Sequence, residues 1–129
     1  MKKSSLGALV AFAAFALLLT FASVASARAG DVVAVGTCTG ASTTKIKLGS
    51  RDGRIEAEFE VDQNRNGVVW QVSLIQNGAT VFSGTAKTKA PSGSFKVRRT
   101  LGDSAGPDTI RGTATNLATG ETCTAVATV

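Results

Sequence analysis

One stretch of the sequence has the residue types and spacing of a cation site. Asp62, Asn64 and Asn66 place oxygen-bearing side chains at alternate positions, and Gly67 follows. This is the opening of a D-x-[DN]-x-[DN]-G calcium loop, in which glycine permits a sharp bend. Ser73 stands where such a loop has a bidentate glutamate. Asp62, Asn64 and Asn66 are therefore candidate calcium ligands, and the alternative is a polar turn whose side chains bond to its own backbone.

A second group of residues is suited to binding an anion. It consists of five basic side chains, Lys87, Lys89, Lys96, Arg98 and Arg99. Residues 63–129 carry seven basic and three acidic side chains, whereas residues 30–62 carry four and six. A basic surface of this kind would attract an anionic cell-wall polymer or an acidic protein. The alternative is a solvated face whose lysines keep an edge strand from pairing with other chains.

The residue types give little support for a catalytic function. The sequence contains no histidine, so the usual pairs of nucleophile and imidazole base are missing. Ser42 and Lys45 match S-x-x-K, but this motif precedes a predicted strand, and its companion motifs S-D-N and K-T-G are absent from the sequence. Glu56, Glu58 and Glu60 lie on a predicted strand face with lysines opposite. We therefore expect a protein that is not an enzyme.

The first 27 residues have the organisation of a secretory signal peptide. Two lysines precede an apolar run from Leu6 to Phe21, and Ala25-Ser26-Ala27 forms the small-x-small pattern of a cleavage site. A membrane anchor is the alternative, but the run is short and no cluster of basic residues follows it. We predict cleavage after Ala27, with Ala29 as the second choice. Residues 28–129 would then form a single secreted domain.

Cys38 and Cys123 are the only two cysteines and lie near the two ends of that domain. In an oxidising compartment we expect them to form a disulfide. The bond would close a loop of 86 residues and stabilise the fold by roughly 4 kcal/mol in the chain-entropy treatment. A reactive or metal-binding pair of thiols is the alternative, although the chain has no histidine and no CxxC motif.

The segments around these residues have the two-residue period of β-strands. In Arg54–Asp62 apolar and acidic residues alternate, and Val68–Gln76 repeats the alternation with the only tryptophan at its centre. We predict that Phe59 and Trp70 anchor the core. Asp52-Gly53 is a preferred two-residue hairpin turn. Folding about it pairs residues of opposite charge outside and apolar residues inside: Lys47 with Glu58, Lys45 with Glu60 and Ile46 with Phe59.

Further strands are predicted along the rest of the mature chain. With the two already described, they occupy residues 31–38, 43–50, 54–62, 68–76, 79–85, 94–98, 109–116 and 121–129. Asn77-Gly78 is a second hairpin signal. Seven or eight short strands with turn residues between them and no helical period predict an all-β, antiparallel sandwich. A closed barrel is the alternative.

Five segments spread over the mature chain carry a resemblance to known proteins. They are Phe59–Gly67 together with Trp70, Ala90–Phe95, Gly106–Ile110, Ala114–Asn116 and Thr119–Cys123. In these segments the chain resembles the small secreted immunoglobulin-like proteins of high-GC Gram-positive bacteria. The resemblance implies an immunoglobulin-like sandwich and an extracellular location, but no activity, because those proteins are functionally uncharacterised. The cysteines depart from the antibody pattern, since they lie in the first and last strands.

The function that these observations predict is a binding or cell-surface interaction module. Its expected contact sites are loops at the ends of the sandwich: Gln63–Gly67, Ala90–Gly93, Leu101–Asp108 and Leu117–Gly120. Candidate partners are the cell wall or an extracellular protein. Without the two leader lysines, 12 basic residues face 9 acidic ones, and this net charge of +3 does not argue for nucleic acid.

Two other functions remain open from the sequence. One is a carrier of a small apolar molecule, for which Val69, Ile75 and Phe82 would supply an apolar patch. The other is an inhibitor of an extracellular enzyme. We expect a monomer or a weakly associating chain without a membrane anchor, and no cofactor beyond the candidate calcium ion.

Overall fold

The computed structural model describes residues 30–129. The predicted signal peptide, residues 1–27, and both predicted cleavage positions lie outside them. Nine strands and no helix occur in the described part of the chain. The strands are β1 (Val32–Val35), β2 (Thr37–Cys38), β3 (Thr43–Arg51), β4 (Arg54–Asp62), β5 (Val69–Gln76), β6 (Ala79–Lys87), β7 (Ser94–Gly102), β8 (Thr109–Asn116) and β9 (Thr122–Thr128).

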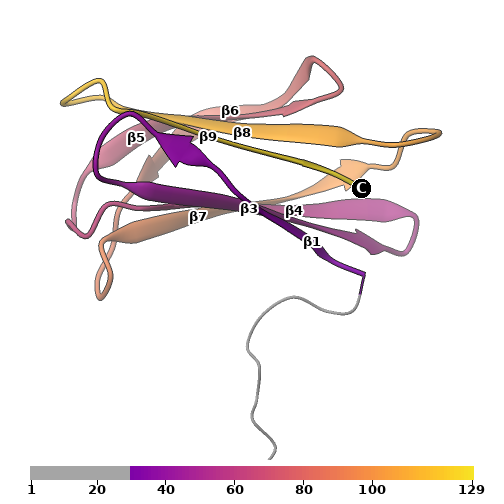
Figure 1. Cartoon of the computed structure of the whole chain (residues 1–129), viewed down its shortest axis with the longest axis horizontal. Coiled ribbons are helices and arrows are strands. Elements are labelled where there is room, and N and C mark those ends of the chain that lie inside the picture. The colour runs from indigo at the N-terminus through magenta and orange to yellow at the C-terminus, as the bar shows by residue number, and fades with distance from the viewer. Residues whose placement is uncertain (1–29) are drawn as a thin grey trace, which may run out of the picture.

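The strands form two antiparallel sheets that pack face to face (Figure 1). The four-stranded sheet has the order β1-β3-β4-β7, and the five-stranded sheet has the order β2-β9-β8-β5-β6. This confirms the predicted β-sandwich. A closed barrel is wrong for the described residues, because no ladder of hydrogen bonds joins the two sheets.

The structure has one strand more than the sequence predicted. The expected strand over residues 31–38 divides at Gly36, so that β1 pairs with β3 in one sheet and β2 pairs with β9 in the other. Gly36 lies against the backbone of Thr124 and Ala125, and a Cβ atom at this position would collide with it. Glycine therefore lets the chain cross from one sheet to the other at this point.

The predicted register of the first hairpin is confirmed. Lys47 pairs with Glu58, Lys45 with Glu60 and Ile46 with Phe59 across β3 and β4. Both turn residues have positive φ, 52° at Asp52 and 71° at Gly53, as a tight hairpin turn requires. The local turn signal and the alternation of charge therefore determine the same pairing.

The two predicted anchors lie at the centre of the core. Phe59 and Trp70 are fully buried, and the Trp70 ring lies 6.1 Å from the Phe95 ring, centroid to centroid. Gly112 of the facing sheet leaves room for Phe59, because a Cβ atom there would collide with the phenyl ring. The interior around Phe59 is thus filled by side chains from both sheets.

Two details of the sequence prediction are wrong. The predicted apolar patch of Val69, Ile75 and Phe82 does not form, because Val69 and Ile75 lie on the outer face of their sheet whereas Phe82 packs against the core. The strand predicted to end at Arg98 continues to Gly102. Its extension is stabilised by Leu101, which pairs with Ile55 and is buried.

Candidate functional site

The structure brings three of the four predicted contact loops together at one end of the sandwich. Gln63–Gly67, Ala90–Gly93 and Leu117–Gly120 all connect strands at the end drawn on the left in Figure 1. Leu101–Asp108 lies at the opposite end, between β7 and β8. The loop between β2 and β3 joins the first end, although the sequence did not single it out.

Two of these loops are held together by the buried Thr88. Its hydroxyl donates to the carbonyl oxygen of Arg65 at 2.6 Å and accepts from the backbone N–H of Val68 at 2.9 Å. The backbone N–H of Gln63 donates to the carbonyl of Gly93 at 3.0 Å. Because Thr88 is only 2% exposed, these bonds are shielded from water and fix the loops relative to one another.

The candidate calcium ligands lie in the Gln63–Gly67 turn and the residue before it. Asp62 Oδ1 accepts a hydrogen bond from the backbone N–H of Asn64 at 3.0 Å, and Asn64 has a φ of 57°. These are features of a turn stabilised by its own side chain. Ser73 lies well inside β5, and an extended strand carries it away from the turn. Calcium binding by Asp62, Asn64 and Asn66 stays a hypothesis, and the self-bonded turn is the alternative that these contacts favour.

The disulfide forms a second feature of the same end. Cys38 and Cys123 are paired directly across β2 and β9, with their Cα atoms 4.0 Å apart. This confirms the predicted disulfide, and Cys38 lies in β2, the second part of the strand predicted over residues 31–38. Both cysteines belong to the five-stranded sheet, so the bond fastens its β2 edge and does not join the two sheets.

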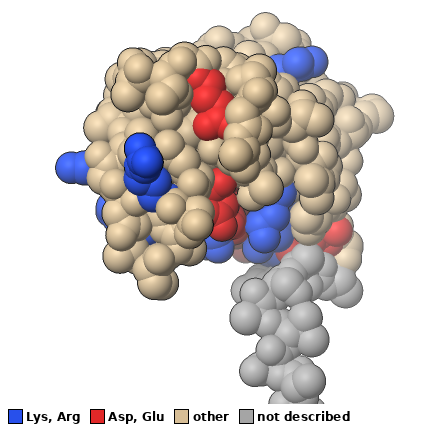
Figure 2. Space-filling view, turned by 60° about the vertical axis from the view of Figure 1, so that its left-hand side comes forward, with Lys and Arg blue, Asp and Glu red and all other residues tan. Residues whose placement is uncertain are grey.

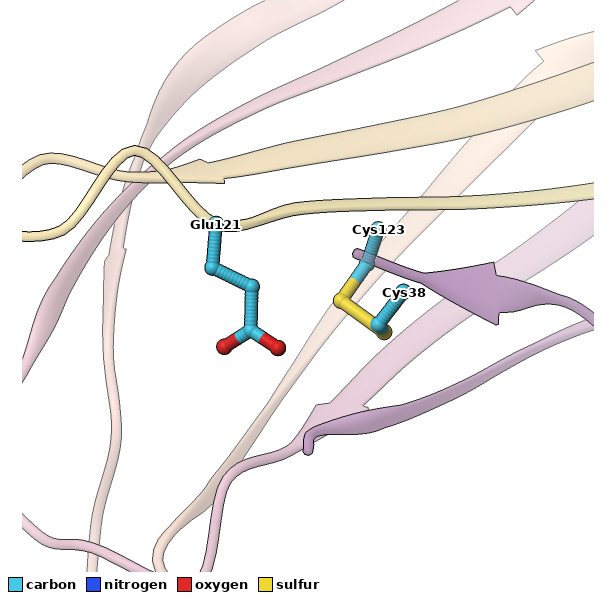
Figure 3. Close-up of side chains that lie close together, drawn as sticks. All are labelled: Cys38, Glu121 and Cys123. Atoms are coloured by element: carbon cyan, nitrogen blue, oxygen red, sulfur yellow. A yellow bond between two sulfur atoms is a disulfide. The ribbon is translucent and has the colours of Figure 1, made fainter. Parts of the chain in front are cut away.

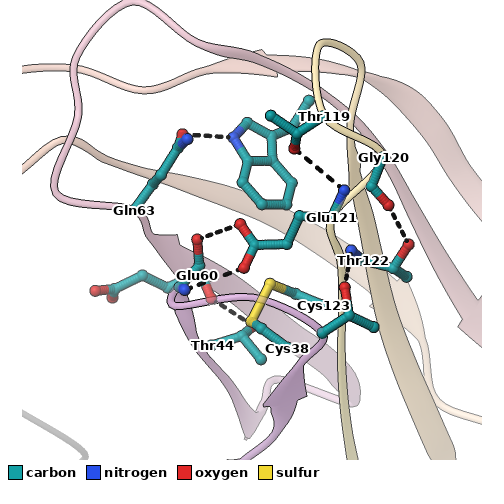
Figure 4. Close-up of a disulfide and its surroundings, with 12 residues drawn as sticks. Cys38, Thr44, Glu60, Gln63, Thr119, Gly120, Glu121, Thr122 and Cys123 are labelled. Carbon is teal, nitrogen blue, oxygen red and sulfur yellow. Dashed lines mark hydrogen bonds between the residues drawn. A yellow bond between two sulfur atoms is a disulfide. The ribbon is translucent and has the colours of Figure 1, made fainter.

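Glu121 lies beside this disulfide (Figure 3). The sulfur atoms of the two cysteines and a carboxylate oxygen of Glu121 lie within 4.8 Å of one another. The two sulfur atoms are bonded to each other, however, and Glu121 lies next to them (Figure 4). The Glu121 carboxylate accepts from the Ser42 hydroxyl at 2.7 Å and from the Ser42 backbone N–H at 3.1 Å. We interpret Glu121 as the residue that fastens the loop between β2 and β3.

The same contacts bear on the S-x-x-K motif. The Ser42 hydroxyl donates to Glu121, and the Lys45 ammonium lies 3.8 Å from a Glu60 carboxylate oxygen. Each group of the motif therefore interacts with a carboxylate. A serine activated by a neighbouring lysine requires the two groups to contact each other, and these contacts give the motif a structural role.

A network of charges covers the outer face of the four-stranded sheet. Glu58 and Glu60 of β4 lie between the lysines of β3 and the basic residues of β7. Figure 2 shows positive and negative side chains next to one another on the lower part of the described protein. Arg98 donates to Glu58 at 2.6 Å, and Lys96 lies 3.5 Å from Glu58 and 3.6 Å from Glu60. The uneven charge along the sequence is therefore largely balanced in space.

Glu58 is the centre of this network. Its side chain is only 9% exposed and lies within 4 Å of Lys47, Lys96 and Arg98. Burial acts to raise the pKa of Glu58, but the hydrogen bond from Arg98 and the positive charges of all three neighbours lower it below its ordinary value. Lys96 and Arg98 were candidates for anion binding in the sequence analysis, but in the structure both form ion pairs with glutamates of β4.

The other three basic candidates lie near the gap between the edge strands β6 and β7. Lys87 and Lys89 line a groove of about 500 Å³ together with Thr85, Ala86, Ser94, Phe95 and Lys96. Among the described residues, no carboxylate forms an ion pair with Lys87 or Lys89. Arg99 lies over the Phe82 ring farther along β7. The groove therefore combines unpaired positive charge with hydroxyl groups and an apolar wall.

Sequence reasoning missed the polar centre at the opposite end. Asp108 is fully buried, and its carboxylate accepts from the side chains of Gln76 and Asn77 and from the backbone N–H of Ser104. The hydrogen bond from Gln76 is the main cause that lowers the pKa of Asp108. No local signal marks Asp108, because two of its partners lie about 30 residues earlier in the chain.

No known protein family, curated protein or solved structure matches this chain. The resemblance to secreted immunoglobulin-like proteins therefore stays a prediction. Over residues 30–129, no helix is long and apolar enough to cross a membrane.

Proposed function

We propose that the protein is a secreted, non-catalytic binding module that contacts an anionic polymer of the cell surface through the groove between β6 and β7. The observation that carries this proposal is the pair Lys87 and Lys89. Both are exposed beside the groove without an ion-pairing carboxylate in the described chain, whereas Lys96 and Arg98 nearby are held by glutamates. Positive charge that is unneutralised and focused at a concave surface attracts polyanions.

The fixed geometry of the loops supports this proposal. Thr88 lies between the two lysines in the sequence and is buried. Its hydroxyl donates one hydrogen bond and accepts another. A ligand that binds there meets a backbone that is already ordered, so little conformational entropy is lost on binding. The filled core around Phe59 and Gly112 favours a surface contact over the alternative of a carrier with an internal ligand.

Co-sedimentation with purified Gram-positive cell walls tests the proposed contact. We expect binding at low salt that falls severalfold as the salt concentration is raised to about 0.5 M, because mobile ions screen exposed charges. The double variant Lys87→Gln/Lys89→Gln should lose most of the bound fraction. Arg54→Gln/Arg111→Gln is the matched control, since it removes two exposed positive charges outside the groove.

Three results would contradict the proposed contact: binding that does not depend on salt, binding that persists after the anionic polymers have been extracted from the walls, or equal losses in both double variants. A tight complex with an extracellular enzyme would instead support the inhibitor alternative. Secretion is tested separately by mass spectrometry of the culture medium. A mature chain that begins at Arg28 or Gly30 is the expected result, and retention of the full-length chain in the cells would oppose it.

A further inference from the structure

The outer faces of the two sheets differ sharply in charge. On the four-stranded sheet, Glu58 and Glu60 of β4 lie between basic residues of β3 and β7. The outer face of the five-stranded sheet, here called the hydroxyl face, has a continuous row across all five strands. The row consists of Thr37, Thr124, Thr113, Ser73 and Ser83, which are paired strand by strand.

A second row runs parallel to the first and is also uncharged. It joins Thr122, Thr115, Gln71 and Thr85 in register across four strands. All nine side chains of the two rows are exposed or half-buried. The rows are flanked by apolar side chains that reach solvent, with exposed fractions of 39% at Val69 and 38% at Val126.

Threonine is common on solvated strands, so the hydroxyl groups alone do not indicate a contact surface. The informative feature is the depletion of charge, which distinguishes the central part of protein interfaces from the rest of a protein surface. In the interior of the hydroxyl face Arg111 is the only charged residue, and it lies between Ile75 and Val126. Its long side chain can direct the guanidinium toward the rim.

We propose that the hydroxyl face is a docking surface for a second copy of this chain. Hydroxyl groups both donate and accept hydrogen bonds, so rows of threonine and serine can pair with the same rows of a symmetry-related copy. The chain after residue 27 carries a net charge of +3, and two such molecules repel each other. The hydroxyl face carries a single charged residue, Arg111, in its interior, so two copies approach there with little opposed charge.

The size of the face sets the expected strength of the dimer. Strands about 4.8 Å apart and about seven residues long give a contact of roughly 500 Å² per copy. The total of roughly 1,000 Å² is at the lower limit for specific interfaces. We therefore infer a weak, reversible dimer. This surface shares Thr85 with the groove between β6 and β7, and Lys87 borders both. Thr113 and Ser83 do not line the groove, so substitutions at these two positions separate failure of the dimer from failure of the proposed function.

Sedimentation equilibrium of the purified, oxidised protein over about 5–500 μM tests the dimer. The average mass should rise from one chain toward two. Thr113→Lys places a positive charge at the centre of the first row in each copy and should weaken association at least tenfold. Ser83→Lys makes the same kind of change at an exposed position of β6 and should also weaken association. It replaces Thr113→Lys as the test if that variant does not fold. Thr100→Lys, on the outer face of the four-stranded sheet, is the matched control and should leave association unchanged.

Two outcomes would overturn the proposal. One is a monomer at every concentration up to 500 μM. The other is association that Ser83→Lys or a folded Thr113→Lys leaves intact, or that Thr100→Lys reduces equally. High salt should preserve or strengthen the dimer because it screens the repulsion between the two copies.

Discussion

The guanidinium carbon of Arg99 lies 4.1 Å from the centroid of the Phe82 ring. Arg99 belongs to β7 and Phe82 to β6, which are the edge strands of different sheets. Arg99 follows Phe95 and Val97 in the alternation that points inward along β7, yet at the open side of the sandwich its side chain covers the aromatic ring. A cation over an aromatic face thus joins the two sheets where no hydrogen-bond ladder does.

Removing this contact should lower stability. We expect Arg99→Ala to reduce the free energy of unfolding by about 1 kcal/mol through loss of the cation–π interaction and of packing over Phe82. Urea denaturation followed by Trp70 fluorescence measures the change. Arg54→Ala, which removes an exposed arginine at the start of β4, is the control. Equal effects of both substitutions would show that Arg99 acts only through net charge.

The disulfide should contribute a large part of the stability. Cys38→Ser opens a link between residues 85 positions apart, and we expect a loss of roughly 3–4 kcal/mol. Thermal melts of the oxidised protein and the variant give the measurement. Cys38→Ser/Cys123→Ser should match the single variant, because either change breaks the same bond. A melting temperature that does not move would mean that β2 is held in place by its other contacts.

Stability should decrease in acid because of Glu58 and Asp108. The folded state lowers the pKa of both carboxyl groups, so the unfolded chain binds protons first as the pH falls. Their stabilisation is present at neutral pH and is lost below about pH 4. Melting temperatures between pH 7 and pH 2.5 should show this decline.

The variants Glu58→Gln and Asp108→Asn test the assignment. Each should melt at a lower temperature than the unchanged protein at pH 7, with the difference narrowing at pH 3, where the native carboxyl groups are protonated as well. Asp103→Asn, which changes an exposed carboxylate in the loop before Asp108, is measured in parallel. A constant difference at all pH values would mean that packing accounts for the effect.

We expect calcium to have no effect on the melting temperature. Asp62 already accepts a hydrogen bond from within its turn, and the sequence provides no glutamate at the twelfth position of the loop. A ligand that binds only the folded state raises its stability. The measurement compares melts in millimolar calcium and in chelator. A rise in calcium that Asp62→Asn abolishes would establish the site and contradict this expectation.

Much of the fold was predictable because it depends on neighbouring strands. The alternation in Arg54–Asp62 and the turn at Asp52-Gly53 specify one pairing, and the structure has that pairing. Phe59 and Trp70 were predictable as buried residues because each lies at the centre of a strand in which apolar residues alternate with polar ones. Such a strand has one apolar face, and that face is buried in the core. The disulfide followed from the presence of just two cysteines.

The candidate sites depended on strands that are far apart in the sequence. Arg98 meets Glu58 because β7 lies beside β4, forty residues away, and this pairing leaves Lys87 and Lys89 as the unpaired lysines at the groove. The row from Thr37 to Ser83 exists only in the order β2-β9-β8-β5-β6.

The sequence by itself therefore determined the strands, the local hairpin, the buried anchors and the cysteine pair. The tertiary structure decided which charges neutralise one another and which hydroxyl groups align. The physical reason is that side-chain alternation and turn conformation act over a few residues, whereas the order of strands in a sheet is a property of the whole packed core.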